Sequence, residues 1–247
     1  MATVAAGLRD GRSPGRVAAV SNIILQRELH ANTRRTRLTY RGTVNGRPAA
    51  IKCYRKPLFG VFHWLRAEVR GRRLRAAGAA VPGLVYSGWF PAKRCFCFAT
   101  AFLENYRPLR AVLTEEPSRA RQLALVVVLG RSLGDAHNKG ILQPDCNLTN
   151  FMLGDNDVLA FVDEDDIRVY RAGLSLAQSR LNLANVAARL PDGEMVATLL
   201  EAYLATRPAG VGASWDRERF QAAIGHWQDR LARKRARRNI TERRRFD

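Results

Sequence analysis

The hydrophobic pattern of this chain changes near residue 104. Before this point the apolar residues fall in short alternating runs, which are typical of half-buried β-strands. After it, leucine and valine recur at the three- and four-residue spacing of helices that bury one face. Strands first and helices afterwards predict an α+β protein with two lobes, and we place the boundary between residues 103 and 104.

The first lobe, residues 21–103, is predicted to contain a β-rich unit with a single helix. The expected strands are residues 21–29, 36–44, 47–55, 83–90 and 94–103. Asn45 and Gly46 separate the second strand from the third, and Asn-Gly between two alternating runs is a strong hairpin signal. The helix is expected at residues 61–77, ending at Gly78.

The second lobe, residues 104–229, is predicted to be mostly helical. A long helix is expected within residues 117–140, followed by a polar loop at residues 143–150 and a short pair of strands. Further helices are expected at residues 176–190, 193–206 and 215–238. Outside the lobes we expect a loosely ordered N-terminus, residues 1–20, and a basic C-terminal tail, residues 230–247.

The chain is strongly basic, with 41 Lys and Arg against 22 Asp and Glu and a formal net charge of +19. Such a charge favours polyanionic partners, although an arginine-rich composition alone accounts for it equally well. For the basic tail we weigh an anionic membrane surface and a solvated terminus equally. Nucleic acid is less favoured, because no aromatic residues interleave with the arginines. No signal peptide or membrane span is recognised, so we expect a cytoplasmic protein with possible peripheral contact at the inner face of the membrane.

The four cysteines are predicted to be reduced packing residues. Cys53, Cys95, Cys97 and Cys146 form no C-x-x-C pair, and their spacing fits no metal site.

The polar loop carries the residues that point to chemistry. Asp145 precedes Asn150 by five positions, the spacing of the aspartate and asparagine in a kinase catalytic loop, and Asp163 follows at the end of an apolar strand. In phosphoryl transfer a carboxylate orients the acceptor hydroxyl, and oxygen ligands hold magnesium against the donor phosphates. We therefore assign Asp145 as the catalytic base and Asn150 and Asp163 as metal ligands. A strand, a turn and a returning strand fit between these two ligands and would bring them together.

Lys52 and Glu68 complete the pattern upstream. Lys52 lies on the third predicted strand and Glu68 on the otherwise basic helix that follows. A lysine and a glutamate in this order form the ion pair that positions donor phosphates in kinases.

At these residues the chain resembles the lipopolysaccharide kinase family, kinase-like enzymes that phosphorylate heptose or Kdo in the lipopolysaccharide core. The segments that carry the resemblance run in order through TRRTRLTYRGTVNGRPAAIKCYR, AEVRGRRL, GAAVPGLVYSGWF, TAFLENYRPLR, AHNKGILQPDCNLTNFML and AFVDEDDIRVYR. The resemblance implies a two-lobed protein-kinase-like fold, with ATP and Mg²⁺ as cofactors and a sugar or glycolipid as acceptor.

Three features depart from the family pattern. Gln143 and Pro144 stand where a histidine is usual before the catalytic aspartate, and Glu164 follows the metal-binding aspartate. No glycine-rich loop covers the nucleotide. Instead, the loop contains residues that we assign to phosphate contacts, and the connector between the lobes adds one more candidate for nucleotide binding: Thr33, Arg34, Arg35 and Glu104.

The sequence thus predicts an ATP-dependent kinase whose acceptor is a hydroxyl, and the resemblance implies that this hydroxyl lies on a sugar of a lipopolysaccharide-type glycolipid. The alternatives are a small-molecule or protein kinase on the same fold, a non-catalytic kinase-like binding module, and a nucleic-acid-binding protein.

Other polar and aromatic residues are interpreted structurally. His137 is expected to cap its helix. Of the acidic residues after Asp163, Asp165 is expected to assist the metal or the loop, and Glu164 and Asp166 to be solvated. Trp64 and Trp89 are expected in the core or an interface.

Overall fold

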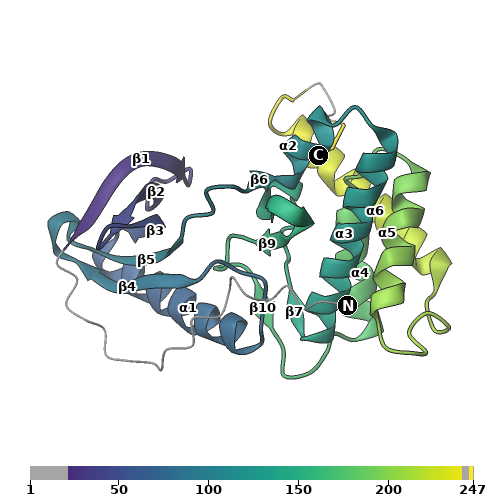
Figure 1. The fold of residues 1–247 in the computed structure, drawn as a ribbon, viewed down its shortest axis with the longest axis horizontal. Coiled ribbons are helices and arrows are strands. Elements are labelled where there is room, and N and C mark those ends of the chain that lie inside the picture. The colour runs from purple at the N-terminus through teal and green to yellow at the C-terminus, as the bar shows by residue number, and fades with distance from the viewer. Residues whose placement is uncertain (1–21, 241–244, 247) are drawn as a thin grey trace. The chain divides into compact units, whose positions relative to one another are not determined.

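The computed structural model describes residues 22–240 and 245–246, except the side chains of Pro57 and Leu58 (Figure 1). The expectation for residues 1–20 lies outside this range. The chain divides into two compact units. The first comprises Met1–Gly71 and Pro82–Leu103, and the second comprises Arg72–Val81 and Glu104–Asp247.

The first unit contains a five-stranded antiparallel sheet in the order β1-β2-β3-β5-β4. Its strands are β1 (Ile23–Ala31), β2 (Arg37–Val44), β3 (Arg47–Tyr54), β4 (Leu84–Phe90) and β5 (Cys95–Ala101), with a short 3₁₀ turn, η1 (Pro91–Lys93), before β5. Asn45 and Gly46 join β2 to β3 with φ of +50° and +79°. Positive φ at both central residues is the geometry that matches the twist of a tight hairpin, so the predicted turn is confirmed.

The two faces of β3 have different neighbours. Ile51 and Cys53 point into a cluster with Cys97 on one face. On the other face Tyr54 packs with Phe98 and with Ala67 of helix α1 (Pro57–Ala76). Side chains alternate along a strand, and residues directly opposite across an antiparallel pair share a face.

Three of the cysteines lie in this sheet. Cys53, Cys95 and Cys97 are buried and free of disulfides, as is Cys146 in the second unit, which confirms the prediction of reduced packing thiols. A hydrogen bond with Cys95 and burial raise the pKa of the Cys53 thiol well above its usual range. Burial also raises the pKa of Cys97 and of Cys146, each to about 12, so these thiols are inert at neutral pH.

Helix α1 begins at Pro57, four residues before the predicted start, since proline suits the first position of a helix. Trp64 stacks on Phe96 with ring centroids 4.6 Å apart, and its indole N–H donates to the Ser87 hydroxyl at 2.8 Å. Trp89 meets the edge of the same Phe96 ring at 5.1 Å. Trp64 therefore packs against the sheet, as expected, whereas Trp89, which belongs to β4, is 44% exposed and does not lie in the core.

The second unit is mainly helical and contains two small sheets, β6-β8-β9 and β7-β10. The helices are α2 (Leu109–Glu115), α3 (Arg119–Asn138), α4 (Leu176–Ala187), α5 (Gly193–Thr206) and α6 (Arg217–Ala236). The short elements are β6 (Arg107–Pro108), β7 (Ile141–Leu142), η2 (Leu148–Asn150), β8 (Phe151–Leu153), η3 (Asp155–Asp157), β9 (Leu159–Phe161) and β10 (Arg168–Val169). Helix α2 was not predicted. It is short, and only Leu109 and Leu113 are buried on it, so its periodic signal is weak.

Helices α3 and α5 pack closely because glycines on α3 leave room. A Cβ at Gly130 would lie 2.7 Å from the carbonyl oxygen of Leu199, and one at Gly134 would lie 2.8 Å from the Cβ of Thr206. These helices share one large core with β8 and β9. A β-rich unit with one helix, followed by a mostly helical unit, confirms the predicted α+β class.

Candidate active site

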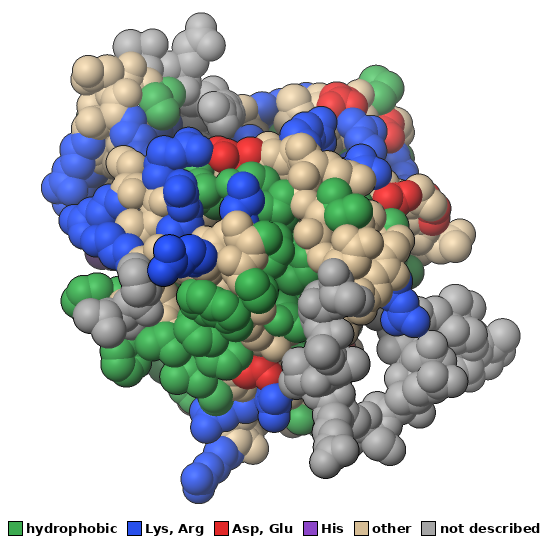
Figure 2. Space-filling model, turned by 90° about the vertical axis from the view of Figure 1, so that its left-hand side faces the viewer, with side chains coloured by type: hydrophobic (Ala, Val, Ile, Leu, Met, Phe, Trp, Pro, Cys, Tyr) green, Lys and Arg blue, Asp and Glu red, His purple; other side chains and the backbone are tan. Residues whose placement is uncertain are grey.

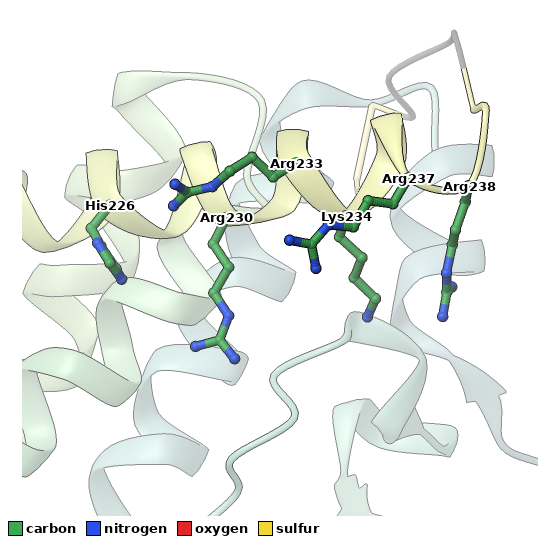
Figure 3. A pocket seen from close by; sticks show the side chains of 6 residues that line it. All are labelled: His226, Arg230, Arg233, Lys234, Arg237 and Arg238. Carbon is green, nitrogen blue, oxygen red and sulfur yellow. The ribbon is translucent and has the colours of Figure 1, made fainter.

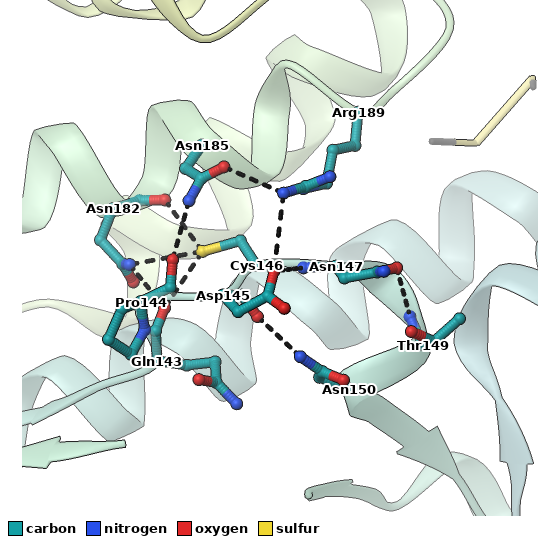
Figure 4. Close-up of polar contacts among 10 residues, drawn as sticks. All are labelled: Gln143, Pro144, Asp145, Cys146, Asn147, Thr149, Asn150, Asn182, Asn185 and Arg189. Carbon is teal, nitrogen blue, oxygen red and sulfur yellow. Dashed lines mark hydrogen bonds and ion pairs between the residues drawn. The ribbon is translucent and has the colours of Figure 1, made fainter. Parts of the chain in front are cut away.

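The predicted catalytic loop follows β7 in the second unit and ends in the 3₁₀ turn η2 (Figure 4). Two asparagines on one face of α4 donate hydrogen bonds to the backbone of this loop. Asn182 Nδ2 donates to the carbonyl of Gln143 at 2.8 Å, and Asn185 Nδ2 donates to the carbonyl of Pro144 at 3.0 Å. The loop backbone is therefore fixed immediately before Asp145.

Asp145 presents its carboxylate to solvent, with half of the side chain exposed. Its Oδ1 accepts the backbone N–H of Asn147 at 3.2 Å, and the guanidinium of the buried Arg189 lies 3.8 Å from the same atom. Within the described part of the chain Oδ2 has no hydrogen-bond partner, so one carboxylate oxygen remains available to a substrate hydroxyl.

Asn150 is oriented by the same loop. Its Nδ2 donates to the backbone carbonyl of Asp145 at 3.0 Å (Figure 4). The side-chain oxygen, the atom that a hard cation would use, accepts no hydrogen bond from the described residues.

The hairpin of β8 and β9 brings Asn150 and Asp163 together within this unit. Phe151 pairs with Phe161, and the Val162 N–H donates to the Asn150 carbonyl at 2.9 Å. Asp163 therefore directly follows Val162, the residue whose backbone is bonded to Asn150. The hairpin expected between the two residues is confirmed.

Gln143 joins the loop to this hairpin. Its Nε2 donates to the Val162 carbonyl at 3.0 Å, and its side chain is buried. Gln143 thus links the segment before Asp145 to the residue before Asp163.

Asp163 has a φ of +65°. A non-glycine residue in this left-handed region carries backbone strain, and such strain is concentrated at functional sites. The φ value could not be foreseen from the sequence, since no glycine marks the position.

Glu164 was expected to be solvated, and this expectation is wrong. Its side chain is only 5% exposed and accepts two hydrogen bonds of 2.9 Å from Arg75 at the end of α1. Both residues belong to the second unit. The ion pair therefore secures the segment that follows Asp163.

The change Glu164→Gln should lower the free energy of unfolding by about 2–4 kcal/mol, because it leaves the guanidinium of Arg75 without its buried counter-charge. Urea denaturation at neutral pH measures this. Glu115→Gln is a matched control, since Glu115 pairs with Arg107 where both side chains are more than half exposed. The control should change stability by less than about 0.5 kcal/mol, and equal losses in the two variants would contradict this role for Glu164.

His137 does not cap α3, contrary to the expectation. Its ring is buried, with Nδ1 2.9 Å from the Tyr203 hydroxyl and Nε2 2.9 Å from Oδ1 of Asn182. The amide oxygen of Asn182 can only accept, so Nε2 carries the proton. A chain of hydrogen bonds thus runs from Tyr203 through His137 and Asn182 to the backbone of the loop before Asp145.

Burial lowers the pKa of His137 to about 4. The unfolded chain binds this proton near pH 6.5, so the stabilisation by neutral His137 is complete above pH 6.5 and is lost as the pH falls. Between pH 6.5 and pH 4 the loss should amount to about 3 kcal/mol. Urea denaturation at pH 7.5 and pH 5 measures the part of this loss that falls above pH 5, about 2 kcal/mol. His137→Gln should reduce the pH dependence, whereas His226→Gln, at an exposed position, should leave it unchanged. Equal pH dependence in all three proteins would contradict the assignment.

Lys52 and Glu68 lie in the first unit. Lys52 is opposite Phe98 in the sheet and two residues before Tyr54, so it lies on the face of β3 that packs against α1. Glu68 is half-buried on α1, next to the buried Ala67. The strand and the helix that carry the predicted pair are therefore packed together.

The residues predicted to contact phosphates lie in the turn between β1 and β2. Thr33 and Arg34 are exposed, whereas Arg35, with a φ of +48°, binds Glu28 through a 2.9 Å ion pair. No local sequence pattern indicates this pairing. Glu104 lies in an exposed turn at the start of the second unit.

The oxygen donors suit magnesium. Among the described residues no three or more His, Cys, Asp or Glu side chains are grouped to hold a metal ion. Magnesium, however, keeps several waters and takes one or two carboxylates together with substrate phosphates. The amide oxygen of Asn150 and the carboxylate of Asp163 fit such a partial site.

A second charged cluster lies at the C-terminal end of α6 and in the residues that directly follow it. Arg230, Arg233, Lys234, Arg237 and Arg238 line an open pocket of about 570 Å³ together with His226 (Figure 3). The opposite face of the helix buries Phe220, Ile224 and Leu231. Helix α6 thus continues into the basic tail and presents an ordered row of cations. In the residues that the structure describes, no helix combines the length and the apolar character needed to cross a membrane.

No protein-family model matches the chain, and no curated protein matches it. Among solved structures, it is similar to the kinase domain of Mycobacterium tuberculosis PknI, crystallised as a double mutant. The identity is 16% and the TM-score is 0.45, over 88% of this chain and 100% of the other.

Proposed function

We propose that the chain is an ATP-dependent phosphotransferase that acts on a hydroxyl group. The observation that carries the proposal is the arrangement of the second unit. There Asn150 is bonded to the backbone of Asp145 and paired through its carbonyl with the residue that precedes Asp163. A solvent-facing carboxylate beside two oxygen donors for a hard cation is what phosphoryl transfer requires.

Each residue has a distinct task in this proposal. Oδ2 of Asp145 accepts the proton of the acceptor hydroxyl and orients its oxygen towards the γ-phosphate. Asn150 and Asp163 hold Mg²⁺, which when bound neutralises charge on the donor phosphates. Lys52, held by Glu68, binds the donor phosphates, with further contacts from Thr33, Arg34, Arg35 and Glu104.

Arg189 is a positioning residue. It lies 3.8 Å from Asp145 and donates to Oδ1 of Asn185 at 3.3 Å. A buried cation beside one oxygen of Asp145 fixes the orientation of the carboxylate and leaves the other oxygen towards the acceptor.

For the acceptor we propose a sugar hydroxyl of a lipopolysaccharide-type glycolipid, which rests on the resemblance in the sequence. A small molecule and a protein hydroxyl are the alternatives. A non-catalytic kinase-like binding module is the alternative from another class of function.

The test is transfer of labelled γ-phosphate from ATP to three acceptors: a core glycolipid with exposed Kdo and heptose, the free sugars, and a generic protein substrate. Label in the glycolipid alone supports the proposed acceptor. Label in the free sugars or the protein replaces it with one of the alternatives. If ATP binds but none of the acceptors is labelled, the sugar assignment fails while the nucleotide site stands.

For the basic face of α6 we propose electrostatic contact with an anionic membrane surface. Nucleic acid remains less favoured, because Trp227, the aromatic residue beside this face, is already engaged. Its indole N–H donates to the Leu181 carbonyl at 3.2 Å, and Arg230 lies over its ring at 4.8 Å. A stacking platform for bases would need a free ring face.

A further inference from the structure

Helix α1 exposes four large apolar side chains along one face. Phe59 and Phe62 are 66% and 68% exposed, and Leu65 and Val69 are 44% and 47% exposed. Their spacing of three or four residues places them on the same side of the helix. The opposite side buries Ala67 and Leu74, so the exposed face is not the one that packs against the protein.

Arginines lie among these apolar residues. Arg66 and Arg73 are exposed and continue the same stripe at three- and four-residue steps, and Arg72 lies beside it. Glu68 is the single acidic residue of the helix, and it is half-buried. The exposed face therefore combines aromatic and aliphatic side chains with positive charge and carries no negative charge.

This combination of apolar side chains and arginines indicates which kind of partner would bind the exposed face of α1. Apolar side chains on one face with arginines beside them are the pattern of helices that lie in the plane of a membrane interface. A protein partner would need an apolar groove with acidic residues in register, whereas an anionic bilayer provides an acyl region and phosphates at any position along the helix. Figure 2 shows hydrophobic side chains gathered in one region of the face that it presents, with Lys and Arg side chains around this region and acidic side chains at several points.

We propose that α1 is an interfacial helix that docks on an anionic lipid bilayer. Phe59, Phe62, Leu65 and Val69 enter the boundary between headgroups and acyl chains, while Arg66 and Arg73 bind lipid phosphates. This contact is separate from the electrostatic contact of α6, since it adds insertion of apolar groups. It is also independent of phosphoryl transfer.

Sedimentation with lipid vesicles tests the proposal on the full chain. The vesicles consist of phosphatidylcholine, alone or with phosphatidylglycerol, and binding is measured at low salt and at ~1 M salt, where exposed charges are screened. The wild type should bind the anionic vesicles and keep part of this binding at high salt. The double change Phe59→Ser with Phe62→Ser should weaken binding at least about tenfold and abolish the salt-resistant part.

Three further variants separate the possible sources of binding. Arg66→Gln with Arg73→Gln should weaken binding to anionic vesicles at low salt only. Arg233→Gln with Arg237→Gln on α6 should also lower only the salt-sensitive part. Leu181→Ser removes an apolar side chain that is 56% exposed on α4 and should have no effect.

Salt-resistant binding that survives the double phenylalanine change, or no vesicle binding by the wild type, would overturn the proposal. A wild type that dimerises in sedimentation velocity, with a monomeric double variant and no vesicle binding, would assign the face to a second copy of the chain instead. All seven substitutions in the four variants lie at exposed positions, and unchanged thermal unfolding confirms that the variants are folded.

Discussion

Asp145→Asn should lower the turnover number about 10²–10⁴-fold and leave the affinity for MgATP nearly unchanged. The amide preserves the shape of the side chain, and its oxygen can still accept the N–H of Asn147 and face Arg189. It cannot accept the proton of the acceptor hydroxyl. A loss confined to turnover is therefore expected for a group that acts on the acceptor and not on the nucleotide.

The matched control is Asp155→Asn, at an exposed position in η3 of the same unit. Its turnover should equal that of the wild type. Turnover of Asp145→Asn within about twofold of the wild type would remove Asp145 from the catalytic role, because general base catalysis contributes far more than this.

Asp163→Asn should abolish the magnesium dependence of ATP binding. Asparagine tolerates positive φ as aspartate does, so the change removes a charged ligand without adding strain at φ +65°. In magnesium titrations of nucleotide binding, the Mg²⁺ concentration at half-maximal effect should rise at least about a hundredfold, or no magnesium effect should remain. This is expected because the site has only one or two carboxylate ligands and the variant loses one of them.

Asp163→Ala is a second variant, and we expect it to lose folding stability as well as the metal ligand. Alanine is disfavoured at positive φ, so this variant should lose about 1 kcal/mol of stability that Asp163→Asn retains. Metal binding that persists in both variants would show that Asp163 is not a ligand, whatever their stabilities.

The elements that could be predicted were those set by local chemistry. Asn45 and Gly46 fixed the hairpin because few other residues adopt positive φ at two successive positions. Helix α3 was recognisable from its apolar spacing and from Gly140, which has a φ of +73° just after the helix. The two-residue strands were missed, since two residues are too short for a periodic pattern.

The errors arose where a partner lies far away in the chain. Glu164 was expected in solvent, but its partner Arg75 lies 89 positions earlier. His137 was expected at a helix cap, but it bonds Tyr203, 66 positions later. No local sequence pattern indicates such distant partners. A charged or polar residue next to a loop is therefore predicted to face solvent.

The supporting residues of the candidate site have a recognisable spacing in the sequence. Asn182, Asn185 and Arg189 recur at three- and four-residue spacing on an otherwise apolar helical segment. Polar residues on the buried side of a helix need partners, and here those partners are Asp145 and the backbone of the loop that precedes it. The roles of Lys52, Glu68, Asp145, Asn150 and Asp163 stay predictions.

The most direct test is calorimetric titration of ATP into the wild-type protein, with Mg²⁺ and again with a chelator. We expect binding with Mg²⁺, and much weaker or no binding with the chelator. Absence of binding in both titrations, or equal binding in both, would contradict a magnesium-dependent nucleotide site built on Asn150 and Asp163.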